Sequence, residues 1–312
     1  MLKEFPESWR CPRCKADKTH LELLDYGKDS AITIYSEEES LPFSRERHEF
    51  RHGTEPEEYV SDIHTMASTG RSLIEPMRTK KSVVSWDDIL IMGAQIAKIP
   101  LNEDILVNTT TVIGPNAKRP LVIETPLFVT HMSFGALSRE TKIALAMGTA
   151  AVKTAIGSGE GGILDEERKY AYRYIFEYVP NRYSVTDENL AMVDAIEIKL
   201  GQSAEPGLGA RLPKEKVTPE IARVRGYPEG KDIISPASYP DIQNQNDLKR
   251  KIEWLQSQSG GRPVGVKIAA GNVEKDLVAL LHARPDFITI DGRPGATGAA
   301  PKYIKAATSV PT

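Results

Sequence analysis

Residues 155–165 read AIGSGEGGILD, and three glycines in this stretch have the spacing G-x-G-x-x-G. In dinucleotide-binding folds such a run follows a strand and opens a helix, whose N-terminus faces a pyrophosphate. Here the strand predicted over 152–156 is short, and the helix predicted over 163–179 starts a few residues late. The match to a dinucleotide turn is therefore partial.

Three interpretations of this glycine run remain open. Glu177 and Asp187 stand at about the distance expected for the acidic partner of a dinucleotide turn, but a predicted helix over 138–153 precedes the run, whereas such a turn normally opens its domain. An ordinary loop between a strand and a helix is the second interpretation. A flavin site is the third, and it depends on the sequence on both sides.

Apolar strand-like runs alternate with amphipathic helices from residue 120 onward, which predicts βα units and a parallel sheet. The predicted strands are 126–132, 152–156, 195–200, 232–236, 264–270 and 287–291. Polar or glycine residues follow nearly every one of them. The active face of a (β/α)8 barrel collects the C-terminal ends of all its strands, whereas an open doubly wound sheet binds ligands at one switch point. The pattern therefore predicts an α/β fold, an incomplete (β/α)8 TIM-type barrel of about six strands.

Two of the predicted helices have a clear apolar face. Ser138 is expected to cap the first helix. Its predicted apolar face consists of Ile143, Met147 and Ala150. The predicted apolar face of the second helix consists of Leu248, Ile252 and Leu255.

The composition, with 40% hydrophobic and 27% charged residues in a chain of 312, is that of an ordinary globular protein of one or two domains. The net charge of -3 argues against nucleic acid as the main partner. No stretch approaches the roughly 18 apolar residues of a membrane span, and the N-terminus lacks the apolar core of a signal peptide. We therefore expect a cytoplasmic protein that binds neither nucleic acid nor membranes.

The N-terminal part differs in composition from the rest of the chain. Residues 1–60 are polar and predict a small appendage, 61–119 a lead-in subdomain, and 120–312 the partial barrel. Cys11 and Cys14, in CPRC, resemble one knuckle of a zinc ribbon or rubredoxin. A tetrahedral site needs four ligands and no second pair of cysteines is present, so these two residues form a weak half-site and no metal is expected.

Lys267 lies in VGVKIAA, a run that predicts a strand buried on both faces. Because an unpaired buried ammonium group is very costly, the lysine needs a charged partner or a ligand. One interpretation is a functional lysine that stabilises negative charge on a flavin or holds a substrate carboxylate. The other is a structural ion pair, with Glu197 as the candidate partner.

The strand predicted at 195–200, AIEIKL, has a period of two. This period places its two isoleucines and Leu200 on one face, and Glu197 and Lys199 on the other. The charged face is expected to point into the barrel or its mouth. An exposed edge strand with a solvated charged face is the alternative.

Six motifs follow one another along the chain, namely HMSFGALS, GSGEGG, IEIKLGQSAEPGLGARLP, DIISPASYPDI, VGVKIAAG and ITIDGRPGATGAAP. In this order they resemble the FMN-binding synthase domain of the glutamate synthase family, over about 120–312 and less closely over 60–120. The resemblance implies a barrel with FMN over its mouth. There 2-iminoglutarate, formed from 2-oxoglutarate and ammonia, would take a hydride from the reduced flavin. The glycine run would be the second loop of this flavin barrel.

The resemblance also implies roles for single residues at matching positions. The implied catalytic residues are Lys267 and Glu197. The implied cofactor-binding residues are Met132, Ser133, Gly135, Gly159, Glu160, Lys199, Gln202, Gly292 and Gly295. Ser203, Glu205 and Ala210 stand where the family pattern has Gly, Lys and Gly, which changes the local charge and backbone freedom.

A (β/α)8 barrel takes about 250 residues, more than 127–312 supplies. We therefore expect strands seven and eight, and the family's iron–sulfur cluster ligands, to be absent from this chain, so that either the reading frame is truncated or another chain completes the barrel. Since the loops after those strands commonly hold a phosphate, we expect the chain alone to bind FMN poorly. The resemblance further implies a separate glutaminase subunit and an electron-donor subunit or ferredoxin as partners.

Two alternatives to a glutamate synthase remain. One is another FMN barrel oxidoreductase that acts on an imino or 2-hydroxy acid. The other is an inactive barrel fragment that serves only as a binding partner.

Overall fold

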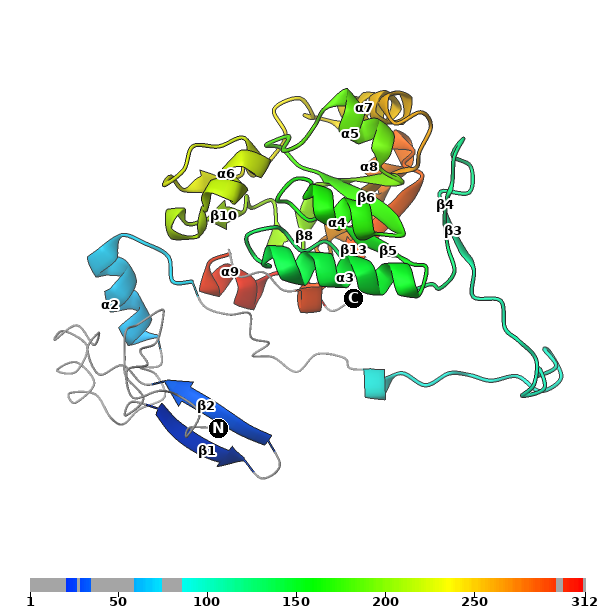
Figure 1. Ribbon diagram of the computed structural model, residues 1–312, viewed down its shortest axis with the longest axis horizontal. Helices are drawn as coiled ribbons and strands as arrows, with labels where there is room; N and C mark the ends of the chain where they lie inside the picture. Colours follow the sequence, from blue (N-terminus) through cyan, green and yellow to red (C-terminus); the bar gives the residue numbers. More distant parts are fainter. Residues whose placement is uncertain (1–20, 27–28, 35–58, 75–85, 296–299, 311–312) are drawn as a thin grey trace. The chain divides into compact units, whose positions relative to one another are not determined.

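The computed structural model describes residues 21–26, 29–34, 59–74, 86–295 and 300–310, drawn in colour in Figure 1. Cys11 and Cys14 lie outside these residues. The chain forms two compact units, Met1–Arg71 and Ser72–Thr312. The described elements of the first unit are an antiparallel hairpin and a helix, namely β1 (Leu21–Tyr26), β2 (Asp29–Ile34) and α2 (Val60–Thr69).

A five-stranded parallel sheet forms the centre of the second unit. Its strands are β5 (Ala155–Gly157), β6 (Arg173–Tyr178), β7 (Ala195–Lys199), β12 (Val264–Ala269) and β13 (Phe287–Asp291). They lie in the order β13-β12-β7-β6-β5, so each strand pairs with the strands before and after it along the chain. A doubly wound sheet would reverse this order at a switch point. The sheet is therefore a curled half-barrel, and the prediction of an incomplete (β/α)8 barrel is confirmed.

One strand of this sheet, β6, had been predicted as part of a helix. The helix expected over 163–179 is shorter than predicted, because α4 covers only Asp165–Tyr170. The backbone is extended at Ala171, and β6 begins two residues later. A short, continuously apolar and aromatic run is compatible with a buried strand or a buried helix. Its pairing with β5 on one side and β7 on the other decides for the strand.

Two of the predicted barrel strands also differ. The strand expected over 232–236 is wrong, because β11 (Ile233–Ile234) pairs antiparallel with β10 (Arg211–Leu212), outside the parallel sheet. A strand at 232–236 would have lain between β7 and β12, but these two strands pair directly with each other. Of the strand expected over 126–132, Val129 alone forms a parallel bridge, to Ile156 at the β5 edge.

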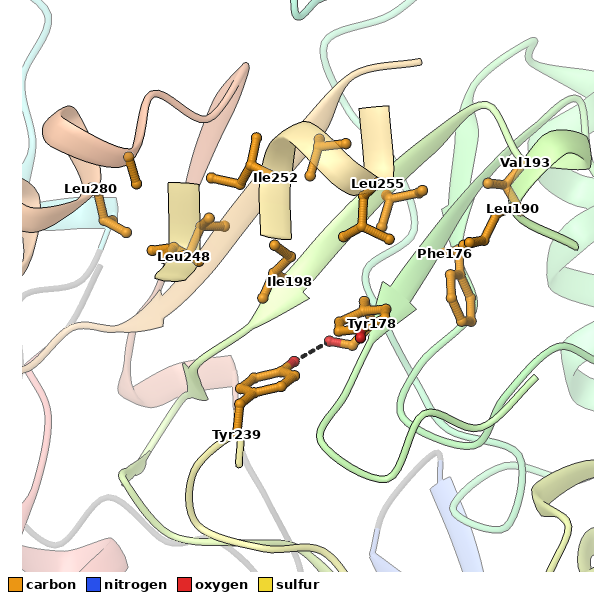
Figure 2. Close-up of a cluster of buried hydrophobic side chains, with 14 of the residues drawn as sticks. Phe176, Tyr178, Leu190, Val193, Ile198, Tyr239, Leu248, Ile252, Leu255 and Leu280 are labelled. Atoms are coloured by element: carbon orange, nitrogen blue, oxygen red, sulfur yellow. Dashed lines mark hydrogen bonds between the residues drawn. The ribbon is translucent and has the colours of Figure 1, made fainter. Parts of the chain in front are cut away.

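Helices α5 (Asp187–Met192), α7 (Gln245–Gln258) and α8 (Val273–Ala283) cover the outer face of the sheet (Figure 1). The Asn244 side chain caps α7 by accepting hydrogen bonds from two backbone N–H groups of its first turn. As predicted, Leu248, Ile252 and Leu255 are buried against the sheet. Figure 2 shows these three side chains in one cluster with Ile198 of β7 and aromatic side chains of β6.

Helix α3 (Arg139–Ala151) begins at Ser138, whose side chain accepts a hydrogen bond from the backbone N–H of Thr141, as expected of the predicted cap. Its buried face differs from the predicted one. The residues that are buried are Lys142, Ala146 and Thr149, whereas Met147 is 54% exposed. The apolar pattern misplaced the face by one position, because one of the inward-facing residues is a lysine.

Inside the half-barrel, a hairpin closes the N-terminal end of the strands. It consists of β3 (Thr111–Ile113) and β4 (Leu121–Ile123). Its Leu121 and Ile123 are buried against inward-facing residues in the N-terminal half of the strands, among them Ala155, Ile175 and Ala195. Apolar packing thus ends there, and the next inward-facing positions are polar.

The remaining elements surround the C-terminal ends of the strands or precede the hairpin. They are η4 (Trp86–Asp88), β8 (Gly201–Gln202), β9 (Glu205–Pro206), η5 (Lys214–Lys216), α6 (Pro219–Arg225), η6 (Arg293–Gly295) and α9 (Lys302–Ala307). None of the helices among the described residues is long and apolar enough to span a membrane.

Candidate active site

A layer of polar side chains fills the half-barrel directly above its apolar floor. It consists of His131, Glu177 of β6, Glu197 of β7, Lys267 of β12 and Thr289 of β13, here called the charged cluster. Bulky branched apolar side chains dominate the interior layers of (β/α)8 barrels. A charged layer costs desolvation free energy that such side chains would not, so its presence points to a function.

Lys267 is the centre of the charged cluster and is only 3% exposed. Its ammonium group is hydrogen-bonded to Glu177 Oε1 and lies 3.4 Å from Glu197 Oε1. Glu197 also accepts a hydrogen bond from the Thr289 hydroxyl. The predicted pairing with Glu197 therefore exists, but Glu177 is the nearer partner. Lys267 and the two carboxylates form a buried triad with a net charge of -1.

The ionisation of this triad follows from competition between burial and pairing. Burial alone would lower the pKa of Lys267, but the charges of Glu177 and Glu197 outweigh it and hold the pKa well above its ordinary value. Burial likewise would raise the pKa of Glu197, but the positive charge of Lys267 and the imidazole of His131 lower it to about 2. Lys267 is thus a fixed positive charge at neutral pH, and is unsuited to donate a proton.

The depressed pKa of Glu197 predicts a pH dependence of stability. A carboxylate whose pKa is lower in the folded state than in the unfolded state contributes stability above the unfolded-state pKa, here near 4.5, and loses it as the pH falls toward 2. Between pH 6 and pH 3 this contribution should fall by about 2 kcal/mol. Urea unfolding at both pH values should show a smaller loss for Glu197→Gln than for the wild type. Equal losses would contradict a depressed pKa.

His131 joins the charged cluster to the second loop of the half-barrel. Its Nδ1 accepts a hydrogen bond of 3.1 Å from the backbone N–H of Gly159, so Nδ1 is unprotonated and the neutral ring carries its hydrogen on Nε2. That Nε2 lies 3.3 Å from Glu197 Oε1. The bond to Gly159 therefore sets the tautomer that faces the carboxylate.

The three glycines of the run are explained by close contacts with other parts of the chain. A Cβ atom at Gly157 would lie 2.5 Å from His131 Nδ1, and one at Gly159 would lie 2.4 Å from the backbone between Met132 and Ser133. Gly162 has a φ of 84° and packs against the side chain of Ser184. The run is thus the loop after β5, packed against the loop at 131–135, and the dinucleotide-turn interpretation is not needed.

Above the charged cluster, Glu160 and Lys199 form a buried ion pair. The second carboxylate oxygen of Glu160 accepts a hydrogen bond from the Ser235 hydroxyl. Ser235 reaches this position because its backbone N–H donates to Ala210 O, which extends the β10–β11 pairing. Although 232–236 is not a barrel strand, it still delivers Ser235 to the site.

The same three side chains, together with Ser238, line a cavity of about 230 Å³ at the C-terminal ends of β6 and β7. Its other walls are the loop at 208–210 and the segment at 236–242, with Tyr239 and Ile242 on the apolar side. A cavity with a polar end and an apolar wall is typical of sites for small organic molecules.

The structure brings some of the predicted cofactor-binding residues together and separates others. Glu160 and Lys199 line the cavity, and Met132 and Ser133 contact Gly159. The remaining ones lie elsewhere, Gly135 against Leu212 and Ile221, Gln202 with its side chain donating to Glu205, and Gly292 and Gly295 in the turn after β13.

Several polar residues of the site were not predicted from the sequence. Glu177 was considered only as the acidic partner of a dinucleotide turn and lay in the supposed helix, and His131 stood in a quoted motif without a role. Lys142 and Glu167 are buried as an ion pair beside the two loops, although both lie on helices whose sequence looks solvent-exposed. A strand assignment for 173–178 would have revealed Glu177, since it places the residue inward.

Among the described residues, His131, Glu177 and Glu197 are close enough to share a metal ion, with one ligand atom each within 4.8 Å of the others. The ammonium group of Lys267 already contacts both carboxylates. We therefore assign the positive charge of this cluster to the lysine.

A family model described as "Conserved region in glutamate synthase" matches residues 59–312, which is most of the chain. The chain belongs to the glutamate synthase family. The predicted resemblance is thereby confirmed. The match includes both loops, the charged cluster and the cavity.

Curated glutamate synthases from several organisms are similar to the chain. It is 34% identical to a glutamate synthase large subunit-like protein of Rhizobium meliloti, with 81% of this chain and 58% of that protein covered. It is 35% identical to the archaeal glutamate synthase [NADPH] of Archaeoglobus fulgidus, with 81% and 54% covered. It is 36% identical to the archaeal-type glutamate synthase [NADPH] of Thermotoga maritima, with 81% and 55% covered. The chain thus spans little more than half the length of these relatives.

Among solved structures, a mandelate oxidase mutant with an FMN adduct is similar to 58% of this chain at a TM-score of 0.36 and 14% identity, with 51% of the mandelate oxidase chain covered. This likeness is too weak to bear on the function. The assignment of the fold depends instead on the strand order of the sheet.

Proposed function

We propose that the chain is the part of an FMN-dependent glutamate synthase that binds the flavin ring and 2-iminoglutarate. The single observation that carries this proposal is the charged cluster beneath the cavity, inside a half-barrel of the glutamate synthase family. The reaction is the reductive amination of 2-oxoglutarate through 2-iminoglutarate. When bound, FMN would supply the hydride for this reduction.

The loops at the mouth suit a planar cofactor that contacts backbone. The chain at Met132 and Ser133 lies directly against Gly159, which leaves no side chain between the two loops. Glu160 and Lys199 are held in place by each other and by Ser235, so they present fixed polar atoms. We propose that the flavin contacts are Met132, Ser133, Gly159, Glu160 and Lys199. The more distant members of the same site would be Gly135, Gln202, Gly292 and Gly295.

Lys267 would hold a substrate carboxylate or stabilise negative charge at the flavin. Its ammonium group lies beneath the cavity, is almost fully buried, and is paired with Glu177 and Glu197. Its raised pKa means that it acts by its fixed charge. Glu197 would orient Lys267 and hold the His131 ring, and we propose no proton transfer for it.

We propose that the complete enzyme needs further barrel strands, a source of ammonia and a source of electrons. A (β/α)8 barrel has eight parallel strands, whereas five are described here, so further strands would have to close the barrel. We propose that the ammonia comes from a separate glutaminase subunit, and the electrons from an electron-donor subunit or ferredoxin. The names of the relatives support NADPH as the reductant.

The proposal predicts the substrate requirement of flavin reoxidation. In a protein extended through the remaining barrel strands, anaerobically reduced FMN should be reoxidised when 2-oxoglutarate and ammonium are added together, and at most slowly by either alone. Stopped-flow absorbance of the flavin measures this directly, and a matched sample with succinate in place of 2-oxoglutarate is the control. Rapid reoxidation by a 2-oxo acid without ammonium would favour the alternative, a 2-hydroxy acid oxidoreductase. A protein that binds no flavin would favour the inactive fragment.

A further inference from the structure

Lys142 of α3 is a buried lysine that the proposed chemistry does not use. It is 1% exposed, although it lies on a helix whose neighbouring residues are partly solvent-exposed. Burial of an ammonium group requires that all of its donors find partners. The ammonium group of Lys142 is hydrogen-bonded to two backbone carbonyls and paired with one carboxylate.

The three donors of Lys142 Nζ reach three different segments. One goes to the backbone carbonyl of Met132 at 2.7 Å, and a second to the backbone carbonyl of Ser158 at 2.9 Å. The third faces Glu167 Oε1 of α4 at 2.8 Å. The other oxygen of Glu167 accepts a hydrogen bond of 2.8 Å from the Tyr174 hydroxyl of β6.

The two carbonyls belong to the two loops that the proposed flavin site uses. Met132 lies in the first loop, 131–135, and Ser158 directly precedes Gly159 and Glu160 in the second loop, 158–162. No other described side chain is hydrogen-bonded to both carbonyls, so the ammonium group is the direct polar link between the two backbones at this point. The Gly159 contact with His131 supports the same junction from the other side.

We propose that Lys142 is a positioning residue that sets the relative position of the two loops and thereby the affinity of the site for the flavin. This inference rests on the proposed function for its ligand, but its structural part can be tested without flavin. Glu167 and Tyr174 would serve to neutralise and orient the lysine, rather than to contact the loops.

Removing the ammonium group alone would confuse two effects, because Lys142→Met would leave the Glu167 carboxylate buried without its cation. The double variant Lys142→Met/Glu167→Gln removes both charges and keeps an acceptor for Tyr174. Glu167→Gln alone keeps the lysine on the two carbonyls. Leu280→Ala, on α8 in the outer core and outside both loops, provides a variant that loses stability for an unrelated reason.

Hydrogen exchange of the flavin-free chain tests the positioning role. Amides of both loops, among them those of Gly135 and Gly159, should exchange about tenfold or more faster in the double variant than in Glu167→Gln, while amides of α7 should not. Faster exchange in Leu280→Ala should spread over the outer core and spare the loops. Unchanged exchange in the loops of the double variant, or a uniform increase along the chain, would overturn the proposal.

An FMN titration followed by flavin fluorescence, with the same variants in a protein extended through the remaining barrel strands, tests the functional part. If the wild type binds FMN, the double variant should bind it about tenfold or more weakly, and Leu280→Ala should bind it as the wild type does. Unchanged affinity in the double variant would overturn the link to the flavin. If the extended wild type binds no FMN, the proposed function fails, whereas a local rise in exchange in the flavin-free chain would still support Lys142 as the link between the loops.

Discussion

Replacing Lys267 with methionine is expected to lower the free energy of unfolding by about 3–5 kcal/mol, the usual cost of removing one partner from a buried ion pair. The substitution keeps most of the volume of the side chain but leaves Glu177 and Glu197 buried with no cation in contact. Both carboxylates would then have to take up protons or draw water into the half-barrel. Urea unfolding followed by circular dichroism measures the loss.

A second variant separates the charge effect from the loss of packing. In Lys267→Met/Glu177→Gln/Glu197→Gln no uncompensated charge is left, so much of the lost stability should return. The matched surface control is Lys249→Met, because Lys249 pairs with Glu253 at 4.0 Å in a solvent-exposed position, and its replacement should change stability by less than about 0.5 kcal/mol. A triple variant as unstable as Lys267→Met would mean that the carboxylates are not the cause.

The same substitution also tests the catalytic role of the lysine. In a protein with a complete barrel, Lys267→Met should slow reoxidation of reduced FMN by 2-oxoglutarate and ammonium by about a hundredfold or more, while the flavin content changes little. The triple variant, if it is stable, should remain slow. A Lys267→Met protein with near-normal reoxidation would leave the lysine as a structural residue only.

Replacing Gly159 with alanine is expected to cost about 2–5 kcal/mol, since a left-handed backbone conformation is unfavourable for alanine and the added Cβ overpacks the loop junction. Gly159 has a φ of 71°, and its Cβ position lies 2.4 Å from backbone atoms of both Met132 and Ser133. Backbone cannot move aside as a flexible side chain can. The two loops would therefore have to separate, and affinity for FMN should fall together with stability.

Gly148 provides the control for this substitution. It lies within α3, its φ is not in the left-handed region, and a Cβ atom there would meet nothing within 4 Å. Gly148→Ala should therefore raise the free energy of unfolding by about 0.5–1 kcal/mol. Thermal and urea unfolding of both variants measure these changes in stability. A Gly159→Ala protein as stable as the wild type would show that the loops are not packed as described.

Local patterns in the sequence were sufficient for much of the fold. The period of two at 195–200 predicted which side chains of β7 point inward, and the spacing of Leu248, Ile252 and Leu255 predicted the buried face of α7. The apolar run around Lys267 predicted its burial. Each of these conclusions depends on the periodicity and burial of one segment, which its own residues encode.

The tertiary structure decided which side chains the buried charged residues contact. Residues 173–178 form a strand because β5 and β7 pair with them, and only that strand brings Glu177 to Lys267. Likewise, Lys142 faces inward because two carbonyls and Glu167 are there to receive its ammonium group. A partner is set by the neighbouring strands and by their register, which are properties of the assembled sheet. By itself the sequence determined that buried charges exist in this barrel, and only long-range pairing determined which charges meet.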